Sequence, residues 1–337
     1  MTGDDHGTSR RATRTVRLGH SDVSVTRLAL GTAPLGGWPE ATDPQVALDV
    51  INAAWAAGFR FFDTAPLYGH GLSEGWLGEA LATRSRDEFS IATKVGRLLR
   101  PTPADQPVIF HGTPPVNPIF DFSHDGVLRS MAESLERLQL DRVDVAHIHD
   151  PDDHLEEAVS GAHKAVLELR DSGVIRAVGA GANSAETLTT LARAGEFDCF
   201  LLAGRYTLLE QGALDNLLPV CAERGISIVA GGVFNSGVLV DPKPGAHYDY
   251  AKAEAPIVER ARRIGAVCER HGVPVKAAAL QFPLGHPAVA CVLTGVRSTA
   301  ELAENAAAFE FPIPPDLWLD LKRERLLRPD APVPEDF

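Results

Sequence analysis

Residues 58–69 read Gly-Phe-Arg-Phe-Phe-Asp-Thr-Ala-Pro-Leu-Tyr-Gly, a short aromatic run that ends in an aspartate and leads into a turn. The run at 59–64 has the length and composition of one buried strand. Seven more apolar or β-branched runs recur along the chain, and each is followed by a helical stretch. These runs lie at 27–31, 89–94, 143–149, 177–181, 199–205, 226–231 and 289–294.

Eight strands that each precede a helix predict a (β/α)8 TIM barrel, in the α/β class. Val46, Val50 and Ala54 have helical spacing, and Asp43 before Pro44 marks the start of that helix. A doubly wound open sheet is the alternative fold, but the first strand lacks the GxGxxG signature of a dinucleotide-binding sheet. Alternating apolar residues before residue 27 predict a hairpin that caps the barrel floor.

The composition restricts the partners of the protein. The 337 residues carry a formal net charge of −13, which disfavours nucleic-acid binding and a polybasic membrane anchor. No apolar run reaches the length of a transmembrane helix, and the polar first residues do not resemble a signal peptide. We therefore expect a cytoplasmic protein with a flexible N-terminal tail at 1–15 and a single barrel domain at 16–337. The oligomeric state is not indicated.

Two further features bear on where the chemistry lies. The four cysteines, at positions 199, 221, 268 and 291, form no CxxC pair, so we expect buried, reduced thiols rather than a metal or disulfide site. The long connections at 96–124 and 234–252 both follow the C-terminal end of a strand. Barrel enzymes carry their active sites on that face, so these loops are expected to be functional.

Four ionisable residues stand at or just beyond the ends of three strands. Asp63 ends the second strand, Tyr68 lies in the loop after it, and Lys94 and His149 end the third and fourth strands. In a barrel these ends converge on one mouth, where an acid, a base and a phenol form a site for proton transfer. Each residue alone has a structural explanation, as an ion pair or a core histidine. The constellation is what indicates catalysis.

The chemistry requires a tyrosine with a lowered pKa. The unperturbed value is about 10, and a drop of about 2 units corresponds to roughly 2.7 kcal/mol. A lysine cation about 4 Å away, at an effective dielectric of about 20, supplies on the order of 4 kcal/mol. We therefore expect Tyr68 to move the proton and Lys94 to stabilise its phenolate. Asp63 is expected to hold Lys94, and His149 to orient a carbonyl.

The chain resembles the aldo-keto reductase superfamily from about residue 16 to residue 305. The motifs that carry this resemblance stand at 58–69, 92–96 (Ala-Thr-Lys-Val-Gly), 134–144 (Ser-Leu-Glu-Arg-Leu-Gln-Leu-Asp-Arg-Val-Asp) and 148–149 (Ile-His). The resemblance implies a barrel oxidoreductase that uses NAD or NADP, with Asp63, Tyr68, Lys94 and His149 as its catalytic tetrad. The stretches at 122–130 and 149–152 look most similar to the branch of aldose 1-dehydrogenases and pyridoxal 4-dehydrogenase.

The resemblance also implies a cofactor site, with phosphate groups near residues 232–237 and the adenosine near 294–305. The expected cofactor-binding residues are Gly31, Thr32, Asn183, Gly232, Val233, Phe234, Ser236, Gly295, Arg297, Ser298, Glu301, Glu304 and Asn305. The nicotinamide side departs from the family pattern, because Gly231 replaces the stacking aromatic residue and Ala203 replaces a glutamine. Phe234 and Tyr206 are the remaining candidates for a stacking ring.

The expected preference for NAD comes from the first turn of the last barrel helix. Relatives that prefer NADP place an arginine there, whereas this sequence has Glu301. A carboxylate repels a 2′-phosphate and accepts a ribose hydroxyl. NADP stays possible because Arg297 is able to hold a 2′-phosphate. Glu301 also has capping-box spacing from Ser298, which explains it without any cofactor.

We predict an NAD(P)-dependent oxidoreductase that oxidises a small molecule, an aldose of the fucose type, to its lactone. Trp38 and Asp150 follow strand ends and are the candidate substrate residues, because a ring stacks on a sugar face and a carboxylate accepts hydroxyls. Reduction of pyridoxal or of other aldehydes and ketones is the alternative within the same chemistry. A metal-dependent barrel hydrolase that uses His147 and His149, and a non-catalytic NAD(P)-sensing subunit, are alternatives from other classes.

Overall fold

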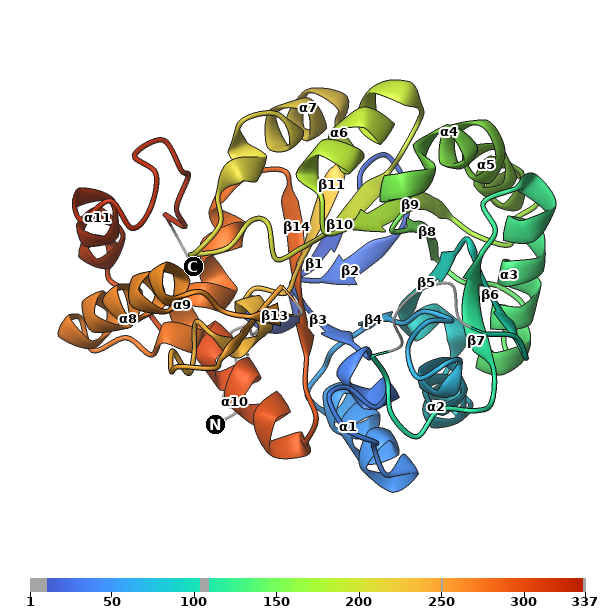
Figure 1. Ribbon diagram of the computed structural model, residues 1–337, viewed down its shortest axis with the longest axis horizontal. Helices are drawn as coiled ribbons and strands as arrows, with labels where there is room; N and C mark the ends of the chain where they lie inside the picture. Colours follow the sequence, from blue (N-terminus) through green and yellow to red (C-terminus); the bar gives the residue numbers. More distant parts are fainter. Residues whose placement is uncertain (1–10, 104–108, 250, 336–337) are drawn as a thin grey trace, which may run out of the picture.

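A computed structural model describes residues 11–103, 109–249 and 251–335, and its centre is a closed barrel of parallel strands (Figure 1). The predicted TIM barrel is thus confirmed, and each predicted strand overlaps an observed one. The barrel strands, in chain order, are β3 (Leu28–Gly31), β4 (Phe61–Asp63), β5 (Ser90–Val95), β8 (Val145–His149), β9 (Ala177–Ala182), β10 (Cys199–Ala203), β11 (Ser227–Gly231) and β14 (Val289–Gly295).

Helices surround the barrel (Figure 1). They are α1 (Pro44–Ala56), α2 (Leu72–Leu81), α3 (His124–Leu138), α4 (Leu155–Glu157), α5 (His163–Asp171), α6 (Ala185–Ala194), α7 (Leu217–Arg224), α8 (Ala255–Arg270), α9 (Val275–Gln281), α10 (Thr299–Glu310) and α11 (Pro315–Arg323). The chain also forms short 3-10 turns, among them Pro34–Gly36, Asp152–His154 and Asn235–Gly237.

The predicted helix start at Asp43 is confirmed, because its side chain accepts a hydrogen bond from the backbone N–H of Gln45. One detail of the predicted face of α1 is wrong. Val46 is 40% exposed, whereas Val50 and Ala54 are buried. The buried face of α1 also includes Ala47 and Ile51. The helix therefore turns Ala47, rather than Val46, toward the core.

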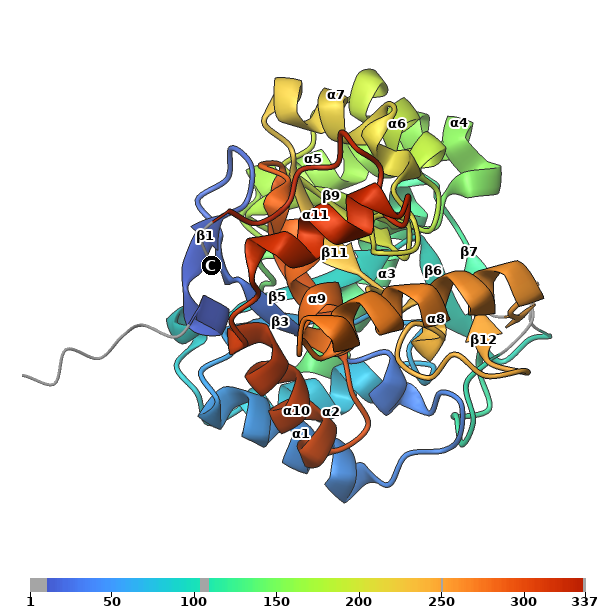
Figure 2. The ribbon, with the colours of Figure 1, turned by 90° about the vertical axis from the view of Figure 1, so that its left-hand side faces the viewer.

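The barrel floor is covered by an antiparallel hairpin, β1 (Thr15–Arg17) and β2 (Ser24–Thr26), as the sequence predicts. Figure 2 shows this hairpin at one end of the barrel and the loops that carry β7 and β12 at the other. Leu18 and Val23 of the hairpin pack with Phe61 and Leu201 in a core enclosed by the barrel. A second core fills the space between the barrel and its helices.

The two long connections contain short sheets that the sequence analysis did not predict. The first forms β6 (Arg97–Arg100) and β7 (Asn117–Phe120), which pair antiparallel. The second forms β12 (His247–Tyr248) and β13 (Ala251–Lys252). Both small sheets stand at the C-terminal face of the barrel, so these loops build the walls of its mouth.

Part of the predicted N-terminal tail is ordered, and the rest, residues 1–10, lies outside the described residues. Residues Arg11–Thr13 form a 3-10 turn whose backbone N–H groups at Arg11 and Ala12 donate to the carboxylate of Glu310, at the end of α10. This contact replaces the expected flexible segment at 11–15 with a packed one. No helix among the described residues is long and apolar enough to cross a membrane.

Candidate active site

The strand ends bring Asp63, Tyr68, Lys94 and His149 together at the barrel mouth. Lys94 is 2% exposed, and its ammonium donates to a carboxylate oxygen of Asp63 at 2.6 Å and to the carbonyl of Thr64 at 3.0 Å. The same ammonium lies 4.6 Å from the centre of the Tyr68 ring. The Tyr68 and His149 rings meet edge to face, with centres 6.0 Å apart and planes at 88°.

The loop that carries Tyr68 is fixed by a close approach between two glycines. A Cβ on Gly36 would lie 2.5 Å from the backbone nitrogen of Gly69, and a Cβ on Gly69 would lie 2.6 Å from the carbonyl oxygen of Gly36. Gly69 also has a φ of +63°, where a side chain would add strain. The two loops can touch only without side chains, and this contact fixes the backbone beside Tyr68.

Behind Lys94, a buried carboxylate holds the neighbouring helices in place. Glu74 of α2 accepts hydrogen bonds from Thr93 of β5 and from the guanidinium of Arg137 in α3, both at 2.6 Å. Because Thr93 precedes Lys94 on the strand, this network restrains the strand end that carries the lysine. Glu74 therefore supports the site without reaching the cleft.

The electrostatics of the site keep both histidines of β8 neutral. Burial, with a smaller effect from the cation of Lys94, lowers the pKa of His147 to about 3. Burial also holds the pKa of His149 well below 6.5, aided by the charges of Arg97 and Lys94. A neutral His149 is able to donate one hydrogen bond to a substrate oxygen without supplying a charge.

The carboxyl group of Asp63 experiences opposing effects. Burial raises its pKa, and the cation of Lys94 acts in the other direction. One oxygen of Asp63 bonds to Lys94, and the other has no hydrogen-bond partner within the described part of the chain. Burial is the larger of the two effects, so the pKa of Asp63 is raised overall.

A main cleft of about 560 Å³ opens over these four residues. It runs from Arg297 and Glu301 at one end to Tyr68 and His149 at the other. Most residues predicted to bind cofactor or substrate line it, together with Ile109 and Phe110 from the first long loop. The predicted cofactor and substrate residues on its walls are Gly31, Trp38, Asp150, Asn183, Gly232, Val233, Phe234, Ser236, Gly295, Arg297 and Glu301.

Four residues predicted to bind cofactor are not on the walls of the main cleft. Thr32 is buried and bonds to the carbonyl of Asp63, and Ser298 caps α10. Glu304 pairs with Lys276 at 2.7 Å on the outer surface. Asn305 is buried and donates to the hydroxyl of Thr294 at 2.8 Å, behind the cleft wall.

The loop after β11 has the geometry of a phosphate-binding turn. Gly232 has a φ of +62°, and a Cβ there would lie 3.0 Å from the backbone nitrogen of Gly204. Asn235, Ser236 and Gly237 follow with φ values of +48°, +56° and +91°. Left-handed turns of this kind present backbone N–H groups that bind anions. The N–H groups of Asn235 and Gly237 donate within the turn, to the carbonyls of Gly232 and Phe234, so an anion such as a diphosphate would have to bind the other N–H groups.

The end of the main cleft near Arg297 carries more negative than positive charge. The guanidinium of Arg297 forms an ion pair with Glu40. The carboxylate of Glu301 accepts a hydrogen bond from the backbone N–H of Arg297 at 2.7 Å, and Ser298 accepts one from the N–H of Glu301. Glu301 therefore lines the cleft and also takes part in the cap of α10.

The sequence profile of the aldo/keto reductase family matches residues 27–323. The chain belongs to the aldo/keto reductase family. As a member of that family it is an NAD(P)-dependent oxidoreductase, which sets aside the hydrolase and sensing-subunit alternatives.

Two characterised relatives in the aldo/keto reductase family match almost the whole chain. A D-threo-aldose 1-dehydrogenase from a Pseudomonas species is 42% identical over 314 residues, which cover 90% of this chain and 95% of the relative. A pyridoxal 4-dehydrogenase from Microbacterium luteolum is 38% identical over 332 residues, with 92% and 97% covered. Among solved structures, the holo form of the aldo-keto reductase AKR11C1 from Bacillus halodurans superimposes with a TM-score of 0.74 at 24% identity, covering 96% of this chain and 99% of that one.

The structure distinguishes between Phe234 and Tyr206, the two candidates for a ring that stacks on the nicotinamide. Gly231 and Ala203 both line the main cleft. Of the two proposed stacking rings, Phe234 lines the cleft, whereas Tyr206 is 1% exposed and packs against Phe282 with ring centres 5.2 Å apart. Tyr206 is therefore a core residue of this reductase.

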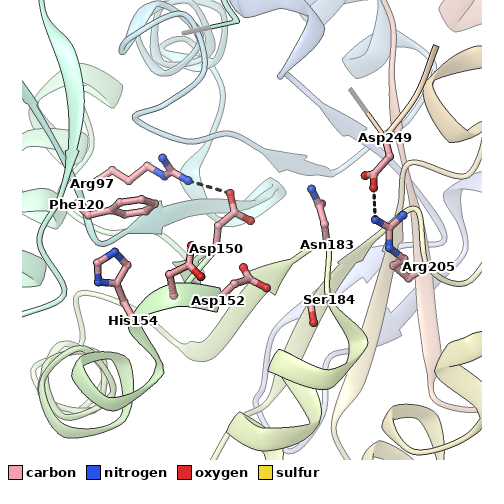
Figure 3. Close-up of a pocket in the computed structure, with 10 residues that line it drawn as sticks. Arg97, Phe120, Asp150, Asp152, His154, Asn183, Ser184, Arg205 and Asp249 are labelled. Atoms are coloured by element: carbon pink, nitrogen blue, oxygen red, sulfur yellow. Dashed lines mark hydrogen bonds and ion pairs between the residues drawn. The ribbon is translucent and has the colours of Figure 1, made fainter. Parts of the chain in front are cut away.

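A second cavity lies beside the main cleft, and of its charged residues only Asp150 was predicted from the sequence. Arg97 begins β6 and pairs with Asp150 at 3.0 Å, and Arg205 follows β10 and pairs with Asp249 at 2.7 Å (Figure 3). The only sequence signal for Arg97 is a charge directly after Gly96, the glycine that follows β5. Asp249 carries no such signal, because it reaches Arg205 from a loop 44 residues away.

Proposed function

We propose that this aldo/keto reductase oxidises a neutral aldose at C1 to the lactone, with NAD as cofactor and Tyr68 as acid–base. The observation that carries the proposal is the position of Lys94, buried between the carboxylate of Asp63 and the ring of Tyr68. A phenol beside a buried cation is suited to exchange a proton with a substrate oxygen near neutral pH. The D-threo-aldose 1-dehydrogenase among the relatives supports an aldose as substrate.

The side chains divide the work of the reaction. A bound nicotinamide cofactor would supply the acceptor for the hydride that leaves C1. The phenolate of Tyr68 takes the proton from the C1 hydroxyl, so that the C–O bond becomes the carbonyl of the lactone. Lys94 stabilises the phenolate, Asp63 holds Lys94 in place, and neutral His149 donates a hydrogen bond to the reacting oxygen.

Two wall residues favour a sugar over a simple aldehyde. Trp38 lines the cleft and offers a ring face to the C–H groups of a sugar. The carboxylate of Asp150 lies 3.4 Å from Nε2 of His149 and is 32% exposed, so it is accessible to a substrate hydroxyl next to the reacting carbon. A polyhydroxylated substrate satisfies these groups better than an apolar carbonyl compound does.

The preference for NAD rests on the acidic end of the cleft. Glu40 occupies the guanidinium of Arg297, and Glu301 adds a second carboxylate on the wall. A 2′-phosphate would have to displace the Glu40 pair and would lie near Glu301, whereas a ribose hydroxyl is able to donate to a carboxylate.

The test is a substrate panel with purified protein. NADH formation is followed at 340 nm with neutral aldoses, including L-fucose and D-galactose, and with pyridoxal, each with NAD and with NADP. We expect kcat/KM for the best aldose with NAD to exceed that for pyridoxal by at least about tenfold, with lactone as the product. A higher value for pyridoxal, for which the second relative is named, would overturn the aldose assignment.

A further inference from the structure

A second cavity of about 420 Å³, here called the side pocket, lies beside the main cleft. The side pocket is lined by Arg97, Phe120, Asp150, Asp152, Arg205 and Asp249, among others (Figure 3). Asp150 and Asn183 line both cavities, so the two share a wall at the end of the main cleft that holds Tyr68 and His149. A molecule that reacts between Tyr68 and His149 is therefore next to the side pocket.

The polar groups of the side pocket are held in fixed positions. Arg97 is 5% exposed, and its guanidinium pairs with Asp150 and stacks 4.1 Å from the centre of the Phe120 ring. Across the cavity, Arg205 pairs with Asp249, and Asp152 accepts a hydrogen bond from the hydroxyl of Thr187 at 2.8 Å. Figure 3 shows the two ion pairs on opposite sides of the cavity, with Asn183 between them.

These groups suit a ligand that carries several hydroxyls. Each sugar hydroxyl donates one hydrogen bond and accepts others, so walls that alternate carboxylates with guanidinium groups match it. Phe120 and His154, whose ring centres lie 4.9 Å apart, add an aromatic wall for C–H groups. The wall therefore combines donors, acceptors and a ring face.

The charge of the side pocket disfavours anions. Four aspartates and two arginines line it, and the arginines are paired with Asp150 and Asp249. Asp152 and Asp153 thus remain without a guanidinium partner among these pairs. A sugar phosphate or a uronate would face two carboxylates, whereas a neutral polyol avoids that repulsion.

We propose that the side pocket is the subsite for the hydroxyl-bearing carbons of a neutral polyhydroxylated substrate whose reacting carbon lies between Tyr68 and His149. This inference rests on the proposed aldose oxidation and specifies which part of the protein recognises the sugar. Recognition of the polyol is then separate from the chemistry, because Arg205 and Asp152 reach the substrate away from the reacting carbon.

The kinetic test removes polar groups of the side pocket that lie outside the tetrad. Arg205→Met removes donors, and Asp152→Asn changes charge with almost no change in shape. With an aldose and NAD, we expect each variant to raise KM by about tenfold, the effect of one lost hydrogen bond to a charged group, with kcat within about twofold. Reduction of propanal with NADH should keep its kcat/KM, because propanal has no hydroxyl to reach the side pocket.

The matched control is Arg100→Met. Arg100 lies on the same β6 strand as Arg97 and forms an ion pair with Glu133 at 2.9 Å, outside both cavities. It should leave KM for the aldose unchanged, and all variants should bind NADH with wild-type affinity by fluorescence titration. Asp152→Asn should also improve KM for galacturonate relative to galactose by about threefold, because one repelling charge is gone.

A binding experiment separates this inference from the proposed reaction. Galactono-lactone is titrated calorimetrically into the protein–NADH complex of the wild type and of both variants. Loss of binding in the variants, without aldose turnover by the wild type, would support the side pocket and overturn the proposed reaction. Aldose turnover with unchanged KM and unchanged lactone binding in both variants would overturn the side pocket. Neither turnover nor lactone binding by the wild type would overturn both.

Discussion

The ammonium of Lys94 lies 2.6 Å from the carboxylate of Asp63, and both side chains are almost completely buried. Asp63 is the last residue of β4 and Lys94 the second-last residue of β5, and these two strands pair side by side. The ion pair is therefore built by the barrel rather than by a loop. Its cation is in turn presented to the Tyr68 ring, which is the basis for the first two predictions.

Tyr68→Phe should lower kcat for the aldose by at least about a hundredfold, because it removes the phenolic hydroxyl that exchanges the proton. Affinity for NADH should stay at the wild-type value. The matched control is Tyr206→Phe, which removes a buried hydroxyl from the core and should leave kcat within about twofold. Steady-state rates and fluorescence titrations check both variants, and a Tyr68→Phe enzyme with more than about a tenth of the wild-type kcat would remove Tyr68 from the mechanism.

Lys94→Met should lower the rate and move the alkaline limb of the pH–rate profile upward. The reason is that the cation that favours the phenolate over the phenol is lost. The exterior residue Lys322 of α11 provides the control, since Lys322→Met should leave the profile unchanged. The measurement is kcat/KM between pH 6 and pH 11. A Lys94→Met profile that coincides with the wild type would contradict the role of the lysine.

The ratio of kcat/KM for NAD to that for NADP should exceed about ten in the wild type. Glu40→Gln frees the guanidinium of Arg297, and Glu301→Gln removes the second carboxylate, so the double variant should shift the ratio toward NADP by about tenfold or more. Glu186→Gln, in the first turn of α6, is the control and should not change the ratio. If the double variant loses stability without any shift in the ratio, then Glu301 serves only the cap of α10.

Thiol reagents should change the initial rate by no more than about a tenth. All four cysteines are buried, and burial raises the pKa of the Cys221, Cys268 and Cys291 thiols to about 12. At neutral pH these thiols are protonated and shielded, so N-ethylmaleimide should react only after unfolding in urea. Rapid inactivation of the folded enzyme would show that a thiol contributes to the site.

The free energy of unfolding should fall as the pH drops below 6.5, in part because of His147. The unfolded chain binds a proton at this histidine near pH 6.5, whereas the folded pKa is about 3, so the unfolded state gains protons first. The loss from this one residue is about 1.4 kcal/mol per pH unit within that window. Urea unfolding at pH 6.0, 5.5 and 5.0 checks the slope.

The variant His147→Leu isolates this contribution. Asp63, whose pKa is raised by burial, acts in the opposite sense, but it is present in both proteins. The difference between the wild type and the variant should therefore change by about 1.4 kcal/mol per pH unit, with the wild type losing stability faster. Parallel curves for the two proteins would show that His147 is protonated in the folded state.

The sequence was sufficient to predict the barrel and the convergence of the tetrad, because both follow from strand ends. A strand that ends in Asp63 and a strand that ends in Lys94 must meet at one mouth once the sheet closes. The β6–β7 hairpin was not predictable in the same way. Its strand Asn117–Phe120 contains Pro118 and lacks a buried stripe, so it carries no periodic signal.

The side pocket could not be predicted from local sequence patterns. Its walls come from the ends of β8, β9 and β10 and from two long loops, and their meeting depends on how those loops fold back. Asp150 was identified because it adjoins His149, but its partner Arg97 lies 53 residues away. Thr32, Glu304 and Asn305 were expected at the cofactor by resemblance, and the structure shows the bonds that they make to Asp63, Lys276 and Thr294, which no local pattern predicts.

The β1–β2 hairpin closes one end of the barrel and leaves the other end open. Leu18, Val23 and Val25 plug its base with apolar side chains, so neither water nor ions can reach the Lys94–Asp63 pair from below. Protons therefore exchange with that pair from the side of the main cleft, which both residues line. The solvent in that cleft is thus the source of the protons that reach the base of the site.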